Sequence, residues 1–167
     1  MPAFKLLFVC LGNICRSPAA DGVMHRQVIE AGWQDRIHID SAGTAGWHSG
    51  KQADARMRKA AAQRGYDLTH LARQVTADDL AEYDLILVMD DQNRRDLRPL
   101  DPQQKHEAKV RLFCEFCTQH PDREVPDPYY GGDAGFEHVL DLMEDGCSGV
   151  LRHIQEQTRG IDFSPGR

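Results

Sequence analysis

Residues 4–20 read FKLLFVCLGNICRSPAA, which is the pattern of a strand, a loop and the beginning of a helix. The apolar run 6–9 has no polar face, which is typical of a strand covered on both sides in a parallel sheet. The Gly-Asn pair that follows tolerates unusual backbone dihedral angles. Ser17 before a proline is a helix-start signal, with the serine as N-cap. The stretch therefore predicts a strand that ends at Cys10, a tight loop and a helix.

The predicted loop has the chemistry of an oxyanion site. A loop that closes onto a helix N-terminus presents unpaired backbone N–H groups and the positive end of the helix dipole to an anion such as phosphate. The same donors, together with a nearby cation, favour the thiolate form of Cys10. Arg16 is that cation, and its guanidinium can hold two phosphate oxygens in a fork. We therefore expect Cys10 and Arg16 to be catalytic, without metal or cofactor, on a phosphate-binding loop made of Leu11, Gly12, Asn13, Ile14, Cys15 and Ser17.

Other interpretations of Cys10 are weaker. A buried structural cysteine is the default for an isolated Cys at a strand end. Here a cysteine, a glycine, an arginine and a Ser-Pro helix start fall within nine residues, which favours a phosphate site. The sequence has neither Gly-x4-Gly-Lys-Ser/Thr nor Gly-x-Gly-x-x-Gly, so we expect no nucleoside-triphosphate loop and no dinucleotide site.

Residues 9–18, VCLGNICRSP, resemble the N-terminal signature of the low-molecular-weight protein tyrosine phosphatases. Further segments resemble motifs of that family in the family's order: 40–44 (DSAGT), 70–74 (HLARQ), 89–97 (MDDQNRRDL) and 127–131 (DPYYG). The resemblance extends from about residue 5 to the final helix. It implies hydrolysis of phosphotyrosine in proteins, and of small aryl phosphates, through a cysteinyl-phosphate intermediate.

The resemblance also assigns supporting roles behind the loop. Considered alone, Ser41 is a loop serine that hydrogen-bonds its own backbone, and His70 is a hydrogen-bonded structural histidine. The family pattern implies that Ser41 is linked to Asn13, and that His70 orients Ser17 and Asn13.

Asp127 lies between two prolines, which hold its backbone extended. One interpretation is an ordinary turn aspartate, since Asp-Pro is common in turns. Loss of a phenolate from phosphorus needs a proton donor that faces the cysteine, so chemistry and resemblance together favour a general acid. Tyr129 and Tyr130 are then expected to line the cleft, and the resemblance makes them candidate phosphorylation sites.

The loop 45–52 has glycines towards both ends and a tryptophan between them. The resemblance implies that this loop walls the entrance of the site, so Trp47 is a candidate for stacking on the substrate's aromatic ring. The alternative, which we weigh equally, is that Trp47 covers a satellite hydrophobic cluster.

Hydrophobic periodicity and capping signals predict alternating strands and helices along the chain. The expected helices are 19–31 with Gly32 as C-cap, 54–64, a short helix after a Thr76–Asp79 capping box, one that Asp90 caps and that runs through 97, a short one from Asp101, and 136–157. The expected strands are 4–10, an edge-like strand around 37–39, 83–89 and 110–113. This alternation predicts an α/β fold: a single three-layer domain with a four-stranded parallel sheet and helices on both faces. The strand order 2-1-3-4 is implied by the resemblance.

Length and charge narrow the class of protein. A chain of 167 residues fits one domain, predicted over 1–159, with a frayed C-terminal tail at 160–167. The net charge of −6 argues against nucleic acid as the main partner. The sequence has no apolar run of about 18 residues and no signal segment at its N-terminus, so we expect no membrane partner and a cytoplasmic location. The expected partners are a tyrosine-phosphorylated protein and a cognate tyrosine kinase.

The five cysteines are an odd number at irregular spacing, which fits a reducing compartment. Cys114 and Cys117 form a Cys-x2-Cys pair, but a structural zinc site needs two more ligands, and His120 alone does not supply them. We therefore expect neither zinc nor redox duty at this pair. Cys15 lies five residues after Cys10 and could capture an oxidised Cys10 as a disulfide; the alternative is a merely buried thiol.

Two other function classes remain open. A thiol-dependent arsenate reductase resembles the same fold and loop but adds cysteines in the middle of the chain, and residues 80–92 contain none. A non-catalytic phosphopeptide-binding module is expected to lack Cys10 or Asp127, and both are present.

Overall fold

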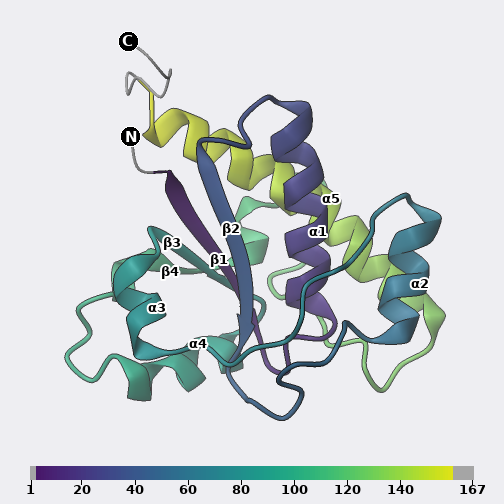
Figure 1. Cartoon of the computed structure of the whole chain (residues 1–167), viewed down its shortest axis with the longest axis horizontal. Coiled ribbons are helices and arrows are strands. Elements are labelled where there is room, and N and C mark those ends of the chain that lie inside the picture. The colour runs from purple at the N-terminus through teal and green to yellow at the C-terminus, as the bar shows by residue number, and fades with distance from the viewer. Residues whose placement is uncertain (1–2, 160–167) are drawn as a thin grey trace.

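The computed structural model of the chain describes residues 3–159, in which strands and helices alternate (Figure 1). In chain order the strands and α-helices are β1 (Phe4–Cys10), α1 (Arg16–Glu30), β2 (Ile37–Gly43), α2 (Ala55–Gln63), α3 (Ala77–Glu82), β3 (Leu85–Val88), α4 (Asp91–Leu97), β4 (Val110–Leu112) and α5 (Asp133–Gln157). Three 3-10 turns accompany them: η1 (Arg98–Leu100), η2 (Glu107–Lys109) and η3 (Phe113–Phe116).

The four strands form one parallel sheet in the order β2-β1-β3-β4. Leu6 on β1 pairs with Ile39 on β2 and with Leu85 on β3, and Cys10 at the end of β1 lies opposite Gly43. The predicted four-stranded parallel sheet and its order are confirmed. The first strand is central, so its carboxyl end, where Cys10 lies, is surrounded by the loops that follow its neighbours.

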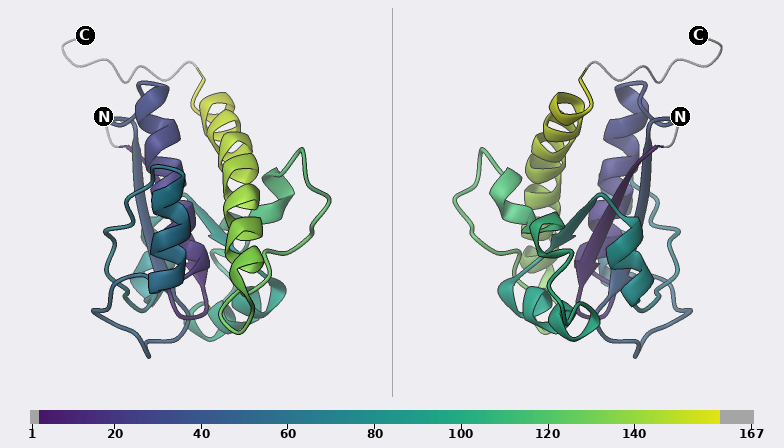
Figure 2. Two further views of the ribbon diagram at one scale, coloured as in Figure 1. Left: turned by 90° about the vertical axis from the view of Figure 1, so that its right-hand side faces the viewer. Right: turned by 90° about the vertical axis from the view of Figure 1, so that its left-hand side faces the viewer.

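The sheet is covered on both faces, and alternate residues of β1 enter two separate cores. Leu6 and Phe8 pack with α1, α2 and α5, whereas Leu7 and Val9 pack with residues of α3, α4 and β4. Figure 2 shows α1 and α5 together on one side of the sheet. All four β1 side chains are fully buried, and burying a Leu or Phe contributes roughly 1.5–3 kcal/mol. This double burial is the reason why the strand reads as a continuous apolar run.

The first helix differs from its prediction at the start. It begins at Arg16 with Cys15 in the N-cap position, so the prediction of Ser17 as N-cap is wrong. The Ser17 hydroxyl is engaged in the loop instead, by Cys10 and Asn13. At the other end Gly32 has φ +74°, as expected for the residue that follows a helix C-cap.

Side-chain caps define the shorter helices. Thr76 and Asp79 form the predicted capping box of α3, and Asp90 caps α4 with Asn93. The short helix predicted from Asp101 is wrong, because the chain makes a turn there in which the Asp101 carboxylate accepts the N–H groups of the fourth and fifth residues after it. The left-handed φ of +54° at Gln104 interrupts any helix at this point.

The last helix, α5, starts at Asp133, three residues before its predicted start. Within the described residues 3–159, no helix is long and apolar enough to cross a membrane. The predicted tail at 160–167 lies outside the described residues.

Candidate active site

The loop between β1 and α1 curls around the thiol of Cys10. Cys10 is only 3% exposed, and its Sγ receives the backbone N–H of Asn13 at 3.3 Å. Ser17 Oγ lies 3.0 Å from the same sulfur. Asn13 has φ +57°, a left-handed conformation that asparagine tolerates better than most residues, and this residue turns the chain back over the sulfur. The geometry agrees with a loop that binds an oxyanion at its centre.

The Asn13 side chain connects this loop to the segments behind it. Its amide Nδ2 donates to Ser17 Oγ at 2.7 Å and to Ser41 Oγ at 3.0 Å. Its Oδ1 accepts the backbone N–H of Arg73 at 3.0 Å and lies 3.0 Å from His70 Nε2. The expected links from Ser41 and His70 to Asn13 are therefore present, and His70 reaches Ser17 through Asn13. The contribution of the Arg73 backbone was not predicted, because it comes from a segment 60 residues away.

Arg16 is held in place from two sides. Its Nη1 donates to Asp90 Oδ2 at 2.6 Å and to the Val125 carbonyl at 3.1 Å, and its Nη2 lies 3.7 Å from Asp127 Oδ2. Burial lowers the pKa of Arg16, but the Cys10 and Asp90 charges raise it by more, so the pKa lies above its usual value and the guanidinium stays charged. Sequence reasoning treated Asp90 only as the cap of α4. Its place just beyond the carboxyl end of a buried strand, after Met89, was the signal that it could also reach the site.

These groups face one cavity of about 280 Å³. The cavity is lined by Cys10, Leu11, Gly12, Ile14, Cys15, Arg16, Trp47, His48, Asp127, Tyr129 and Tyr130. Every predicted catalytic and cleft residue is thus at this cavity, while Asn13, Ser17, Ser41 and His70 are joined by the hydrogen bonds described above. Sequence reasoning missed His48, although it noted the loop that carries it.

Aromatic side chains form the rim of the cavity. Trp47 is 71% exposed and Tyr130 is 93% exposed, and the rings of Tyr129 and Tyr130 meet edge to face with centroids 5.0 Å apart. The Tyr129 backbone N–H donates to Asp127 Oδ1 at 3.0 Å, which leaves Oδ2 towards Arg16. The rim therefore offers apolar ring faces around a charged floor.

The remaining cysteines are free thiols. Burial, and then the negative charge of Asp54, raises the pKa of Cys15, so Cys15 is a neutral thiol beside Cys10. Among the described residues, Cys114 and Cys117 belong to no group of three side chains that could hold a metal ion; the one such group is Asp21, Asp40 and His70.

A family model described as low molecular weight phosphotyrosine protein phosphatase matches residues 5–160. The chain belongs to this family. The phosphatase is 50% identical to a relative from Synechocystis sp. over 92% of this chain and 98% of the relative. It superposes with a TM-score of 0.89 on a protein tyrosine phosphatase from Entamoeba histolytica that has Hepes in its active site, at 43% identity over 93% of this chain and 99% of that one.

A more distant structure is the Drosophila arginine phosphatase, with a TM-score of 0.83 and 30% identity over 95% of this chain and 100% of that one. The predicted family, its fold and a protein-tyrosine-phosphatase activity are thereby confirmed.

Proposed function

We propose that the phosphatase hydrolyses phosphotyrosine in proteins through a cysteinyl-phosphate on Cys10. The observation that carries this proposal is the convergence of three groups on one cavity: the Cys10 thiol, the buried Arg16 guanidinium and the Asp127 carboxyl. They come from the end of β1, the start of α1 and a loop more than a hundred residues later. This is the arrangement that a nucleophile, a phosphate clamp and a proton donor require.

In the first step the Cys10 thiolate attacks phosphorus in line with the bond to the leaving phenolate. An S–P bond forms as the P–O bond breaks, and Asp127 transfers its proton to the departing oxygen. The loop N–H groups and Arg16 stabilise the negative charge of the three equatorial oxygens. In the second step Asp127 takes a proton from water, the water oxygen attacks phosphorus, and the P–S bond breaks to release phosphate and the thiolate.

The contacts of Arg16 prepare it for this role. Asp90 and the Val125 carbonyl fix Nη1, so Nη2 and the edge of the guanidinium stay in position for phosphate. Phosphate bound to Arg16 would repel the neighbouring Asp127 carboxylate, and a proton on Asp127 removes that repulsion. We expect phosphate to bind between Arg16 and Asp127, where the two side chains form an ion pair in its absence.

The walls of the cavity support an aromatic substrate. Ile14, Trp47 and Tyr129 present apolar surface around the charged floor, which suits a phenyl ring attached to the phosphate. The experiment compares hydrolysis of peptides that carry phosphotyrosine, phosphoserine or phosphoarginine, in the presence of a chelator. We expect a clear preference for phosphotyrosine, and none of the three to be hydrolysed by Cys10→Ser.

A preference for phosphoarginine would contradict the proposed substrate class and indicate an arginine phosphatase, like the Drosophila relative. Appreciable turnover by Cys10→Ser would overturn the assignment of the nucleophile. Thiol-dependent reduction of arsenate without hydrolysis of any peptide would favour the arsenate reductase alternative.

Leaving groups of different basicity test Asp127. If Asp127 protonates the phenolate, Asp127→Asn slows phosphorylation of Cys10 most for basic phenolates and least for an activated nitrophenolate. Asp133→Asn, at an exposed carboxyl a few residues later, is the matched control and should show no such trend. An equal loss of rate across the series would leave Asp127 a structural turn residue.

We further propose a cytoplasmic setting, with a tyrosine-phosphorylated protein as substrate and a cognate tyrosine kinase as partner. The five free cysteines support a reducing compartment. Fractionation of the source cells should recover the phosphatase with cytoplasmic markers, and recovery with exported proteins would contradict this. The Cys10→Ser protein should retain tyrosine-phosphorylated proteins from the same extract; retention unaffected by removing their phosphates would contradict the substrate class.

A further inference from the structure

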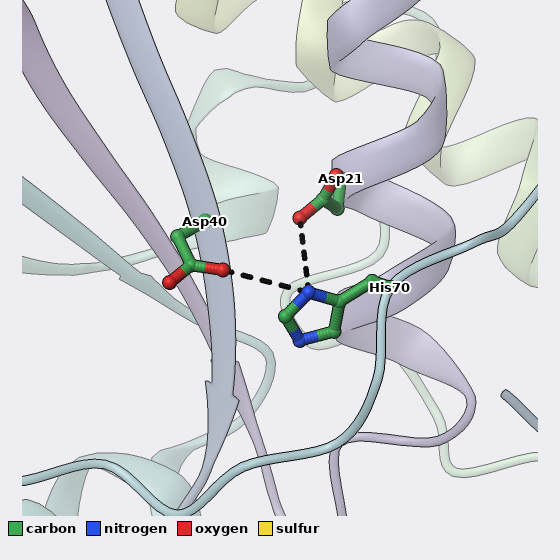
Figure 3. Close-up of side chains that lie close together, drawn as sticks. All are labelled: Asp21, Asp40 and His70. Carbon is green, nitrogen blue, oxygen red and sulfur yellow. Dashed lines mark ion pairs between the residues drawn. The ribbon is translucent and has the colours of Figure 1, made fainter. Parts of the chain in front are cut away.

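The Cys-x2-Cys pair, Cys114 and Cys117, lies apart from the catalytic groups. Neither residue lines the catalytic cavity. A different cluster, made of Asp21, Asp40 and His70 (Figure 3), contacts the active-site loop through His70 and belongs to the site already described. From the sequence alone no redox role is expected of the cysteine pair, because spacing does not show whether two thiols meet.

A single 3-10 turn brings the two thiols together. The turn is η3, and the backbone N–H of Cys117 donates to the Cys114 carbonyl at 3.1 Å. Side chains at positions i and i+3 of a 3-10 turn lie one above the other. A turn of four residues keeps its end Cα atoms within about 7 Å, and disulfides span Cα separations of about 4.4–6.8 Å. The thiols of Cys114 and Cys117 are in hydrogen-bonding contact, so the turn presents them at the separation that a disulfide needs.

The contacts of η3 with α5 hold this turn in place. Cys117 Sγ donates to the Leu142 carbonyl at 3.7 Å. The next three backbone N–H groups, at 118–120, donate to the Asp145 carboxylate at 2.9–3.1 Å. Phe113, at the start of the turn, is fully buried. Because the backbone is fixed on both sides of the pair, an S–S bond can form by rotation of the two side chains.

The pair ionises more readily than the buried thiols of Cys15 and Cys147. The hydrogen bond from Cys117 lowers the pKa of Cys114 by more than burial raises it, because an S–H donor stabilises the neighbouring thiolate. Burial raises the pKa of both Cys15 and Cys147. Cys114 keeps 7% of its surface exposed and Cys117 is half-buried, whereas Cys147 has no exposed surface. A small oxidant can therefore reach a thiolate at this pair.

We infer that Cys114 and Cys117 form a redox-active dithiol that hydrogen peroxide converts into an intramolecular disulfide. The Cys114 thiolate attacks one peroxide oxygen, so an S–O bond forms, the O–O bond breaks, and a sulfenic acid and hydroxide result. The Cys117 sulfur then attacks the Cys114 sulfur. An S–S bond forms as the S–O bond breaks, and the Cys117 proton leaves with the hydroxyl group as water.

The overall reaction is a transfer of two electrons from the dithiol to peroxide. A cellular dithiol restores the reduced pair by thiol–disulfide exchange and is itself oxidised to a disulfide. Disulfides in reducing compartments are typically transient and redox-sensing, which agrees with the free thiols of the structure. The inference concerns a site separate from Cys10 and does not depend on the proposed substrate or mechanism.

Tryptic mapping of the full chain after peroxide treatment tests this inference, because trypsin separates the cysteines by site. Cys114 and Cys117 share the peptide 112–123, the two cysteines of the active-site loop share 6–16, and Cys147 lies on 124–152. The native protein is treated with peroxide in the presence of a chelator, quenched with catalase, denatured and alkylated. We expect the peptide 112–123 to become two hydrogen atoms lighter and to resist alkylation. Treatment with dithiothreitol should restore full alkylation.

Cys117→Ser removes the thiol that captures the sulfenic acid. Cys114 should then proceed to the sulfinic acid, two oxygen atoms heavier, and the fraction of peptide 112–123 that dithiothreitol recovers should fall several-fold. Cys147→Ala is the matched control, because it removes a nearby buried thiol that the inference leaves unused, and it should form the same disulfide as wild type.

The inference is overturned if both cysteines of peptide 112–123 stay free for alkylation at peroxide doses that oxidise Cys10. A disulfide that joins peptide 112–123 to peptide 124–152 would also overturn it, because the partner would then be Cys147. Equal recovery in Cys117→Ser and wild type would show that Cys117 captures nothing. The map of the wild-type protein decides the matter if a variant fails to fold.

Discussion

Asn13 both donates and accepts side-chain hydrogen bonds and adopts a left-handed backbone conformation. Replacing it by glycine and by alanine separates the contributions of these two features to stability. Both changes remove four hydrogen bonds, to Ser17, Ser41, His70 and the Arg73 backbone. At a net value of about 1 kcal/mol for each bond, Asn13→Gly should lower the free energy of unfolding by about 4 kcal/mol. Alanine has to adopt the same left-handed φ of +57°, which glycine does without strain, so Asn13→Ala should cost about 1 kcal/mol more than Asn13→Gly.

Urea denaturation of the three proteins at pH 7, followed by circular dichroism, measures both differences, provided that the slopes with urea agree. A loss below about 1 kcal/mol in Asn13→Gly would refute the claim that this amide holds the loop in place. Equal stability of the alanine and glycine variants would refute the claim that the left-handed turn constrains this position.

Three further predictions concern positions outside the catalytic groups. Burial raises the pKa of Asp145, but N–H donors from the segment after η3 lower it by more, from 3.8 to about 2. Asp145→Asn should therefore lower the free energy of unfolding by about 2 kcal/mol at neutral pH, and this loss should shrink as the pH falls from about 4 to 2; a loss that does not depend on pH would contradict the prediction. Gly149→Ala places a Cβ 2.0 Å from a backbone carbonyl of η3 and should destabilise the protein strongly, whereas Gly135→Ala, whose new Cβ has its nearest contact at 3.5 Å, should not. The urea midpoint of unfolding should therefore fall in Gly149→Ala only, and equal midpoints of the two variants would contradict this. If Cys15 captures oxidised Cys10, thiol treatment should recover less activity from peroxide-treated Cys15→Ala than from wild type, and equal recovery would leave Cys15 a buried thiol.

The parts of the fold that follow from local patterns were predictable. The apolar run of β1, the capping boxes at Thr76 and Asp90, and the glycine after α1 each depend on neighbours within a few residues. The start of α1 was misplaced because Ser17 resembles an N-cap by sequence, while its hydroxyl serves Cys10 and Asn13. Here the demands of the loop override a local capping preference.

The parts of the site that depend on distant segments were not predictable from residue patterns. Asp90 reaches Arg16 from the end of an adjacent strand, and the Arg73 backbone N–H reaches Asn13 from a loop in which no residue pattern indicates that contact. No spacing rule relates such pairs, because the sheet order brings them together. The proximity of Asp21, Asp40 and His70 was not predicted for the same reason.

The central claim is that phosphate passes through a covalent bond to Cys10, and isolation of that intermediate tests it most directly. An aryl phosphate should be mixed with the phosphatase, the reaction stopped in acid within the first turnover, and the peptides analysed by mass spectrometry. The account predicts a burst of phenol close to one equivalent of enzyme and a phosphoryl group on the peptide 4–20, attached to Cys10 and absent from Cys10→Ser. Full turnover with an unmodified Cys10 at every quench time, or a phosphoryl group on another side chain, would contradict it.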